Sequence, residues 1–405
     1  MRSTRYKAFA FVLCILIIGI FIAAPRSPNR ITSRAAGTVS TSKLGVFILQ
    51  DSPGGTEILN RGPAVVNVLD PQANPSLLAR IRAFRGQYPT AKIIMRVYTG
   101  TQQLHYAITD NPVASAQDYW TRALKPALDK LSASDKQLFD YMSGPVEYNN
   151  TPEWKDSASA QWYGTFWSQL ADLIHQAGMK PNLGEIPVGN PEITNLNILM
   201  PPVLAALRKI RDYGGVWSYH AYTLQYTTDT GAEVWYSLRY RQIYTYLSQN
   251  YADLASMPMI LTEAGVDQTG DPGTSGWQKR GDAAKYEAWL SWFDGEIKKD
   301  SYVIGATIFQ SGDTYWSSFN IEPIASWFAN YLNPSLTSPT PTSPAGTCGK
   351  KSIGDADCDG SVTLTDFEIF RKEYRQTKQT KSADFNGDSF VNLSDFEIWR
   401  SNKGR

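Results

Sequence analysis

The sequence predicts an α/β protein organised around a (β/α)8 barrel, followed by a smaller all-α domain that carries two acidic loops. From Leu44 to about Leu332, short β-rich runs alternate eight times with longer amphipathic runs. The short runs are almost continuously apolar, as strands of a parallel sheet buried on both faces must be. Near the C-terminus, one acidic segment occurs twice. Eight alternations over roughly 290 residues fit the size of such a barrel.

The period of the apolar residues predicts where the individual elements lie. Strands are expected at 44–49, 64–69, 92–98, 138–142, 180–186, 215–221, 259–263 and 303–309. Apolar residues at helical spacing predict helices between them, at 76–88, 115–131, 162–177, 199–213, 235–247 and 283–299. An open doubly wound sheet is the main alternative, but no glycine-rich phosphate loop follows the first strand.

The composition limits the classes of function. A net charge of +1 gives no electrostatic reason to expect a nucleic-acid partner. Aromatic residues make up 12% of the chain, and sugar-binding clefts use such flat side chains as stacking platforms, although most of these rings are expected to serve packing. Only 3 histidines occur, so no His-rich metal site, and no cofactor, is expected in the barrel.

The first residues have the pattern of an export signal. Basic residues precede an apolar segment from Ala8 to Ala24, and this order is typical of secretory signals. Because the segment is at the short limit for crossing a bilayer, residues 1–25 are either a cleaved signal peptide or an N-terminal membrane anchor. The absence of a clear small-x-small cleavage site favours the anchor. Residues 26–43 would then be a linker, and the remaining chain would be extracellular or at the cell surface.

A change of composition marks the second domain boundary. Residues 334–347 are rich in Pro, Ser and Thr, which favours an extended spacer of about 40 Å at most. The boundary separates a barrel at 44–333 from a C-terminal domain at 348–405. With Cys14 in the apolar segment, Cys348 and Cys358 remain, either as a disulfide that closes a short loop or as two independent thiols.

The C-terminal domain contains two copies of one acidic loop. Asp355–Arg371 and Asp384–Arg400 align without a gap, which marks two copies of one supersecondary unit. In each copy, oxygen-bearing residues occupy loop positions 1, 3, 5, 7 and 12, the spacing that wraps a calcium ion. We therefore expect two Ca²⁺ ions, held by Asp355, Asp357, Asp359, Ser361 and Asp366 in the first loop and by Asp384, Asn386, Asp388, Phe390 and Asp395 in the second.

Each loop runs into a helix, but no comparable helix precedes it, so the pair departs from a full EF-hand. Residues 353–403 resemble a type I dockerin domain, the calcium-dependent module that docks into cohesin domains on scaffold or surface proteins. The resemblance implies a cohesin partner and implies that calcium is required for folding, because so small a domain has little core of its own. It also implies a cohesin-contacting surface formed by Leu364, Thr365, Leu393 and Ser394.

Two glutamates follow apolar runs in the barrel. Glu147 comes after the fourth expected strand, and Glu263 ends the seventh. Retaining glycosidases need an acid that protonates the leaving oxygen and a carboxylate that attacks the anomeric carbon, about 5 Å apart. Because the ends of these strands face one another across the mouth of a barrel, the two residues are candidates for this pair.

The barrel resembles the clan A glycoside hydrolases, the cellulase-like and mannanase-like enzymes. In that clan the glutamate on the fourth strand is the acid/base and the one on the seventh is the nucleophile, which implies these roles for Glu147 and Glu263. The sixth strand often carries His-x-Tyr, and the sequence WSYHAYT supplies His220 and Tyr222. The resemblance implies that Tyr222 hydrogen-bonds the nucleophile and that His220 orients the acid/base or the sugar.

The chain departs from the pattern of this clan at two positions. Val146 stands where members have Asn, and Gln310 ends the eighth strand where Trp is frequent. Arg96 would bind a sugar hydroxyl or tune Glu263, although a structural ion pair is the more common use of such a residue. The residues expected to bind substrate are Arg96, Asn149, Glu185, Gln310 and Trp316.

These features predict an exported glycoside hydrolase that cleaves a β-linked polysaccharide or oligosaccharide with retention and is tethered through its dockerin. The main alternative is a non-catalytic carbohydrate-binding or adhesion protein on a degenerate barrel, for which Val146 is the best evidence. A barrel enzyme with a non-sugar substrate is a third possibility, which no metal-binding pattern supports.

Overall fold

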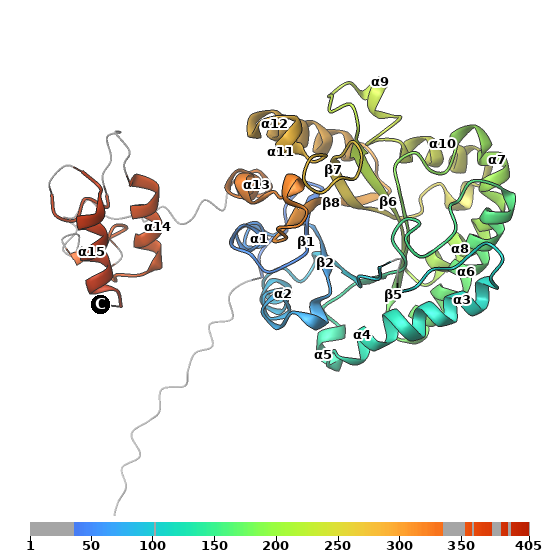
Figure 1. Cartoon of the computed structure of the whole chain (residues 1–405), viewed down its shortest axis with the longest axis horizontal. Helices are drawn as coiled ribbons and strands as arrows, with labels where there is room; N and C mark the ends of the chain where they lie inside the picture. Colours follow the sequence, from blue (N-terminus) through green and yellow to red (C-terminus); the bar gives the residue numbers. More distant parts are fainter. Residues whose placement is uncertain are drawn as a thin grey trace, which may run out of the picture. The chain divides into compact units, whose positions relative to one another are not determined.

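The computed structural model describes residues 36–100, 103–334, 353–358, 360–374, 382–387 and 390–404. In the first two ranges, eight parallel strands form a closed barrel in chain order (Figure 1). This confirms the predicted fold and excludes the open doubly wound sheet. The strands are β1 Leu44–Ile48, β2 Val65–Leu69, β3 Lys92–Arg96, β4 Tyr141–Ser143, β5 Lys180–Ile186, β6 Val216–Thr223, β7 Met259–Val266 and β8 Val303–Ser311.

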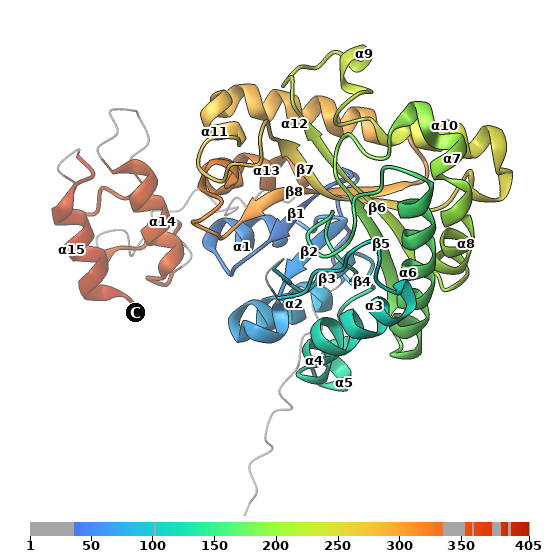
Figure 2. The same ribbon diagram turned by 45° about the vertical axis from the view of Figure 1, so that its right-hand side comes forward.

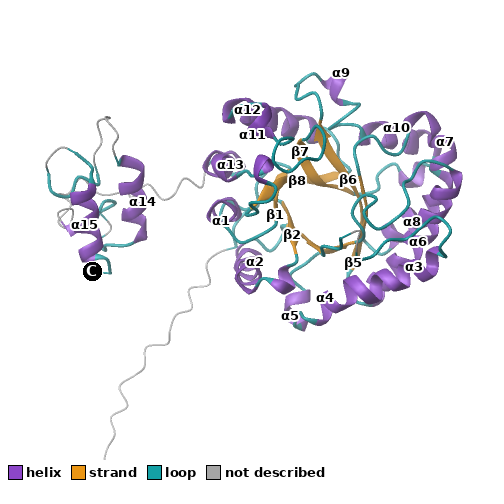
Figure 3. Cartoon of the chain, viewed as in Figure 1, coloured by secondary structure: helices purple, strands orange, loops and turns teal. Residues whose placement is uncertain are grey.

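Helices cover the outside of the barrel, so that the strands are buried on both faces (Figure 3). Helix α6, for example, packs against β5, and α8 packs against both β5 and β6 (Figure 2). The helices are α1 Pro53–Leu59, α2 Pro75–Gln87, α3 Pro112–Tyr119, α4 Lys125–Asp129, α5 Ala133–Lys136, α6 Ser157–Gln176, α7 Leu196–Leu199, α8 Leu204–Asp212, α9 Thr230–Glu233, α10 Tyr240–Asn250, α11 Trp277–Arg280, α12 Ala283–Ile297 and α13 Ala325–Leu332. Short turns complete the layer: a π-helical turn at Trp120–Leu124 and 3-10 turns at Pro71–Ala73, Ile193–Asn195, Pro201–Val203, Ala252–Leu254, Ser317–Phe319 and Glu322–Ile324.

Three predicted helices are divided or shortened in the structure. The helix expected at 115–131 is divided by the π-helical turn before Pro126, because proline cannot donate a backbone hydrogen bond in a helix interior. The one expected at 199–213 is divided by Pro201 and Pro202 into α7, a 3-10 turn and α8. The helix expected at 235–247 begins only at Tyr240, and Trp235 is exposed.

The barrel has two apolar layers. Inside the barrel, Val65, Ile94, Tyr141, Val216 and Ile260 from five strands form a plug. A larger cluster of aliphatic and aromatic residues fills the space between the strands and the helices. Toward the carboxyl ends of the strands, β5, β6 and β7 bury charged or titratable side chains, among them Glu185, His220 and Glu263.

The C-terminal domain is all-α, as predicted. It consists of α14 Leu364–Glu373 and α15 Leu393–Asn402, which lie side by side (Figures 1 and 2). The rings of Phe367 and Trp399 stack between the helices with centroids 4.7 Å apart, and the Trp399 indole donates a 2.7 Å hydrogen bond to the carbonyl of Thr363. This small aromatic core joins the two sequence repeats into one unit.

Within the residues that the structure describes, no helix is both long enough and apolar enough to cross a membrane. The segment Ala8–Ala24, on which the sequence placed an export signal or anchor, lies outside those residues.

Candidate active site

The carboxyl ends of the strands surround a cleft of about 610 Å³. Both predicted catalytic glutamates line it, together with Tyr222 and Arg96. Most of the remaining lining residues follow strands β3, β4, β7 and β8, and they include Tyr98, Tyr119, Val146, Asn149, Asp267, Asp313, Tyr315 and Trp316. The cleft therefore lies at the end of the barrel where barrel enzymes keep their chemistry.

One histidine joins the two glutamates. The Nδ1 atom of His220 lies 2.7 Å from Oε1 of Glu147 and 3.7 Å from Oε2 of Glu263. These two carboxylate oxygens are therefore at most about 6.4 Å apart. The barrel brings together three residues that are far apart in the sequence.

The pairing of β6 with β7 explains why His220 lies close to Glu263. His220 is the register partner of Glu263, and the pairing shifts by one residue between Tyr219 and His220. Such irregularities re-aim side chains at strand ends. Because side chains alternate along a strand, Tyr222 points to the same face as His220, and its hydroxyl donates a 2.7 Å hydrogen bond to Oε2 of Glu263.

Glu263 is held as a carboxylate. Arg96 Nη1 donates to its Oε1, Tyr222 donates to its Oε2, and the residue is 8% exposed. Burial alone would raise the pKa of Glu263, but the charges of His220 and Arg96 and the hydrogen bonds from Tyr222 and Arg96 lower this pKa below its ordinary value. An ionised, fixed carboxylate is what a nucleophile requires.

Glu147 has a more open environment. It lies in the loop after β4 with a φ of 47°, a left-handed conformation that is uncommon for a residue other than glycine. Its backbone N–H donates to the carbonyl of Glu185 at 3.0 Å, and the Thr151 hydroxyl donates to its carbonyl at 3.3 Å. The backbone is thus fixed by neighbours while the side chain keeps 36% of its surface exposed, so it can reach both substrate and water.

His220 is completely buried. Burial would lower the pKa of His220, but the two carboxylates that face its Nδ1 raise this pKa above the ordinary value. When Nδ1 carries a proton, it donates to Glu147.

The structure places the five residues expected to bind substrate in different positions. Arg96, Asn149 and Trp316 line the cleft. Glu185 is fully buried, and its Oε2 lies 3.5 Å from Nε of Arg96. Gln310 is also fully buried, and its amide holds the loop after β8 by donating to the carbonyls of Asp313 and Trp316. Neither Glu185 nor Gln310 is among the described residues that line the cleft.

Several lining residues were absent from the sequence prediction. Tyr98 and Tyr315 are 64% and 70% exposed at the cleft, and Asp267 follows Glu263 by four residues. Burial raises the pKa of Asp267 above its ordinary value. The sequence could have indicated these residues, because they follow strands 3, 8 and 7 and the loops at this edge of a barrel face the cleft.

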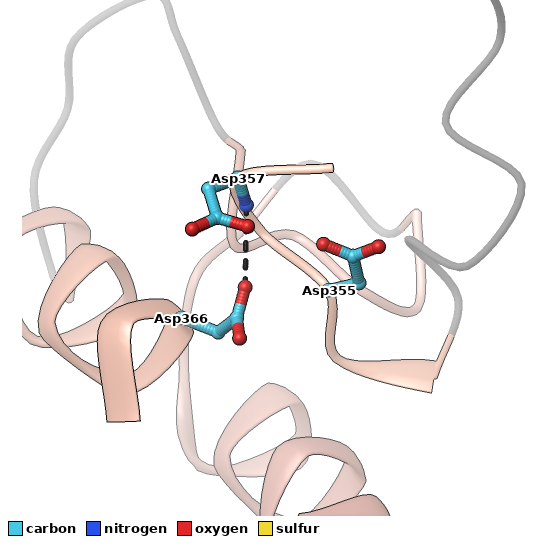
Figure 4. Close-up of side chains that lie close together, drawn as sticks. All are labelled: Asp355, Asp357 and Asp366. Carbon is cyan, nitrogen blue, oxygen red and sulfur yellow. Dashed lines mark hydrogen bonds between the residues drawn. The ribbon is translucent and has the colours of Figure 1, made fainter. Parts of the chain in front are cut away.

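The first acidic loop of the C-terminal domain gathers three carboxylates. Each of Asp355, Asp357 and Asp366 offers an oxygen within 4.8 Å of the others (Figure 4). The Asp366 carboxylate, from the first turn of α14, also accepts backbone hydrogen bonds from Ala356 at 2.6 Å and Thr363 at 2.6 Å. Such a group of hard oxygen donors fits a calcium ion.

The second loop repeats this arrangement. Asp395, on the first turn of α15, accepts hydrogen bonds from the backbone N–H groups of Phe385 at 2.7 Å and Asn392 at 2.9 Å. Gly387 has a φ of 75° and donates to Asp384 at 2.8 Å. Of the other predicted calcium ligands, Ser361 of the first loop and Asn386 of the second are among the described residues. Asp359 and Asp388 lie outside them.

Two further predictions concern the surface and the cysteines of this domain. The four predicted cohesin-contacting residues are all exposed, with Leu364 at 60% and Leu393 at 64%. Cys358 is disulfide-bonded, and Cys348, the partner that the sequence suggested, lies outside the described residues.

Comparison with known proteins identifies the C-terminal domain. Residues 353–400 match the family model described as the dockerin type I domain, so the chain ends in a type I dockerin domain, as the sequence predicted. None of the curated proteins compared with the chain matches it.

Three solved structures illustrate what the barrel is similar to. A glycoside hydrolase family 5 enzyme from Prevotella bryantii B14 is 14% identical, with 69% of this chain and 87% of that one covered and a TM-score of 0.44. An endo-β-1,3-glucanase of family 128 from Pseudomonas viridiflava is 13% identical, with 73% and 99% covered and a TM-score of 0.41. A β-mannanase from Thermomonospora fusca is 16% identical, with 65% and 75% covered and a TM-score of 0.38. At these values the function of the barrel must be inferred from the site itself.

Proposed function

We propose that this protein is a glycoside hydrolase that cleaves β-linked polysaccharide or oligosaccharide with retention of configuration. The observation that carries the proposal is the contact of both Glu147 and Glu263 with the same nitrogen of His220, at 2.7 and 3.7 Å. Two carboxylates that share one neighbour lie close together, which supports the short separation of about 5 Å that a retaining mechanism uses.

The environments of the two carboxylates support different roles. Glu263 is buried, ionised and held by Arg96 and Tyr222, so it is assigned as the nucleophile. Glu147 is more exposed, so it can reach both a leaving group and water, and it is assigned as the acid/base. Two carboxyl groups with contrasting surroundings are the pattern that divides acid and nucleophile roles between them.

The reaction would proceed in two steps. Glu263 attacks the anomeric carbon while Glu147 gives its proton to the departing glycosidic oxygen, which forms a glycosyl ester on Glu263. Glu147, now a carboxylate, takes a proton from water as that water attacks the same carbon. The ester bond breaks, Glu263 is released as a carboxylate, and Glu147 is protonated again.

The cleft walls support a sugar ligand. Tyr98 and Tyr315 present exposed rings at the cleft, and Trp316 also lines it, in contact with the rings of Tyr315 and Phe309. Flat aromatic faces suit the apolar faces of pyranose rings. Asn149, Asp267 and Asp313 supply polar groups for sugar hydroxyls.

We also propose that the dockerin domain binds two Ca²⁺ ions and tethers the enzyme to a cohesin-bearing scaffold or surface protein. The repeated Asp366 and Asp395 environments support one ion in each loop. Calcium would supply the charge that orders each loop, and the exposed Leu364, Thr365, Leu393 and Ser394 would contact the cohesin. Secretion through residues 1–25, as a signal peptide or an anchor, fits this extracellular role.

A non-catalytic carbohydrate-binding protein is the second candidate, and Val146 favours it. This residue lines the cleft beside Glu147 and cannot give the hydrogen bond that the Asn of clan A enzymes gives to a sugar. Asn150 does not replace it, because its amide donates to the carbonyls of Thr99 and Leu104.

Hydrolysis of a glycan panel by the full chain separates the two candidates. Native protein should release reducing sugar from at least one β-glucan, mannan, xylan or galactan, and Glu263→Gln should reduce the rate by several orders of magnitude. NMR of the first product formed should show the anomeric configuration of the substrate. Binding to a glycan without hydrolysis would support the adhesion protein, and an inverted product would exclude the nucleophilic role of Glu263.

A further inference from the structure

Strand β5 ends in an irregular turn of the backbone. Gly184 and Glu185 have φ values of 119° and 43°, and the β5–β6 register shifts between Leu183 and Ile186. The N–H of Glu185 donates to the Ser218 hydroxyl at 2.9 Å, which fixes this bulge against β6. A residue other than glycine in the left-handed region is strained and points to a functional constraint on that residue.

The Glu185 carboxyl group is enclosed in the barrel and held on one side. The Ser143 hydroxyl donates to Oε1 at 2.6 Å, and Asn182 Nδ2 donates to the same oxygen at 3.2 Å. Oε2 has no hydrogen-bond partner among the described residues and lies 3.5 Å from Nε of Arg96. The arrangement therefore directs one free carboxylate oxygen at the guanidinium.

Arg96 connects this carboxyl group to the proposed nucleophile. Its Nε side faces Glu185, and its Nη1 donates to Glu263. Because the guanidinium is planar and rigid, fixing one edge fixes the direction of the other. Arg96 is itself 8% exposed, so water does not compete for these contacts.

Glu185 belongs to a group of charged and titratable side chains from four elements. The groups that face it are Arg96 from β3, His220 from β6, Glu263 from β7 and Tyr119 from α3. Arg96 is the cation nearest to Glu185, and an ionised Glu185 would share this cation with Glu263.

We propose that Glu185 is a positioning residue that holds Arg96 against Glu263 and, as a carboxylate, offsets part of the positive charge that Arg96 places on the nucleophile. The expected effect on hydrolysis rests on the proposed glycosidase function. The effect of Glu185 on the pKa of Glu263 can be measured without any substrate.

The sign of the effect follows from electrostatics. A negative charge at Glu185 disfavours the ionised form of Glu263, so that removing it must lower the pKa of Glu263. Burial raises the pKa of Glu185 itself, and Arg96 opposes that shift. If Glu185 were neutral throughout the working range, replacing it by an uncharged isostere would leave Glu263 unchanged.

The test is Glu185→Gln in the full chain, followed by the pH profile of kcat/KM on the glycan that the native enzyme hydrolyses. We expect kcat to fall about tenfold, because Arg96 is less firmly held. The acidic limb of the profile, where kcat/KM falls as Glu263 becomes protonated, should move to lower pH by about half a unit. Ser143→Ala, which removes one hydrogen bond to the carboxylate, should move the limb in the same direction by less. It serves as the test if Glu185→Gln fails to fold.

A matched control separates positioning from a merely structural role. Glu233 is also fully buried and is held by the hydroxyls of Thr223 and Ser237 at 2.6 Å each. Glu233→Gln should lower Tm without moving the acidic limb. An acidic limb that is unchanged in Glu185→Gln, with kcat within twofold of the native value, would overturn the proposal.

A second readout keeps this inference apart from the proposed function. In protein with 13C-labelled glutamate, the Glu263 carboxyl resonance can be assigned by its loss in Glu263→Gln and titrated in the native chain and in Glu185→Gln. A downward shift of its titration supports the proposal even if no glycan is hydrolysed. An unchanged titration overturns it even if the native enzyme is active.

Discussion

Tyr222 donates its hydroxyl proton to Oε2 of Glu263 across a 2.7 Å hydrogen bond between neighbouring strands. Burial, the Glu263 charge and this hydrogen bond all raise the pKa of Tyr222 well above its ordinary value, so the hydroxyl stays protonated and can only donate to the carboxylate. A hydrogen bond of this kind stabilises the ionised form of its acceptor and thereby lowers the pKa of Glu263.

Tyr222→Phe should therefore raise the pKa of Glu263 and move the acidic limb of kcat/KM to higher pH, by about half a unit or more. The shift is opposite in sign to the one expected for Glu185→Gln. A pH profile of initial rates measures both. Tyr226→Phe is the matched control, because the Tyr226 hydroxyl is buried and has no hydrogen-bond partner in the described structure. A limb that stays in place in Tyr222→Phe would contradict the assigned role.

Arg96→Met should lower the free energy of unfolding by about 3–5 kcal/mol, because it leaves the carboxylates of Glu263 and Glu185 without their buried cation. Urea denaturation at neutral pH measures this. Arg208→Met is the control, since Arg208 and Asp253 form an ion pair that is 41% and 46% exposed, and the loss of such a solvent-screened pair should have a much smaller effect. Equal effects of the two substitutions on the free energy of unfolding would show that Arg96 stabilises the barrel no more than a surface arginine does.

The pair of glutamates could be predicted because it depends on features that are visible in the sequence. Apolar runs that end in an acid mark strand ends, and the barrel topology then brings Glu147 and Glu263 together. His220 and Tyr222 were predicted from the resemblance to clan A enzymes. The alternation of side chains along β6 places both residues on one face of the strand.

The position of Glu185 could not be predicted in the same way. Period-two alternation assumes a regular strand, whereas the bulge at Gly184 and Glu185 depends on the Ser218 hydroxyl of the neighbouring strand. Gln310 illustrates the same limit, because its side chain turns to the carbonyls of its own loop. Both outcomes are decided by tertiary hydrogen bonds that leave no local pattern.

Removal of calcium should unfold the dockerin domain and leave the barrel folded. Bound Ca²⁺ would offset the repulsion between the clustered carboxylates of Asp355, Asp357 and Asp366. EDTA should increase proteolysis within residues 353–404 and leave the activity and the main thermal transition of the barrel unchanged. Asp366→Ala should abolish one of the binding events seen by calorimetry. Identical proteolysis with and without calcium would show that the loops do not depend on the metal.

The last prediction concerns the cohesin-contacting surface. Leu364 and Leu393 begin α14 and α15 in equivalent positions and expose 60% and 64% of their surface. Replacing both by Asp should abolish binding to a cohesin panel in calorimetry, because exposed aliphatic anchors are lost and charge is introduced. The calcium-dependent circular dichroism should persist, since neither side chain belongs to the core. Ile198→Asp, which changes an exposed aliphatic residue on the barrel, should leave cohesin binding intact. Unchanged binding by the double variant would place the partner surface elsewhere on this domain.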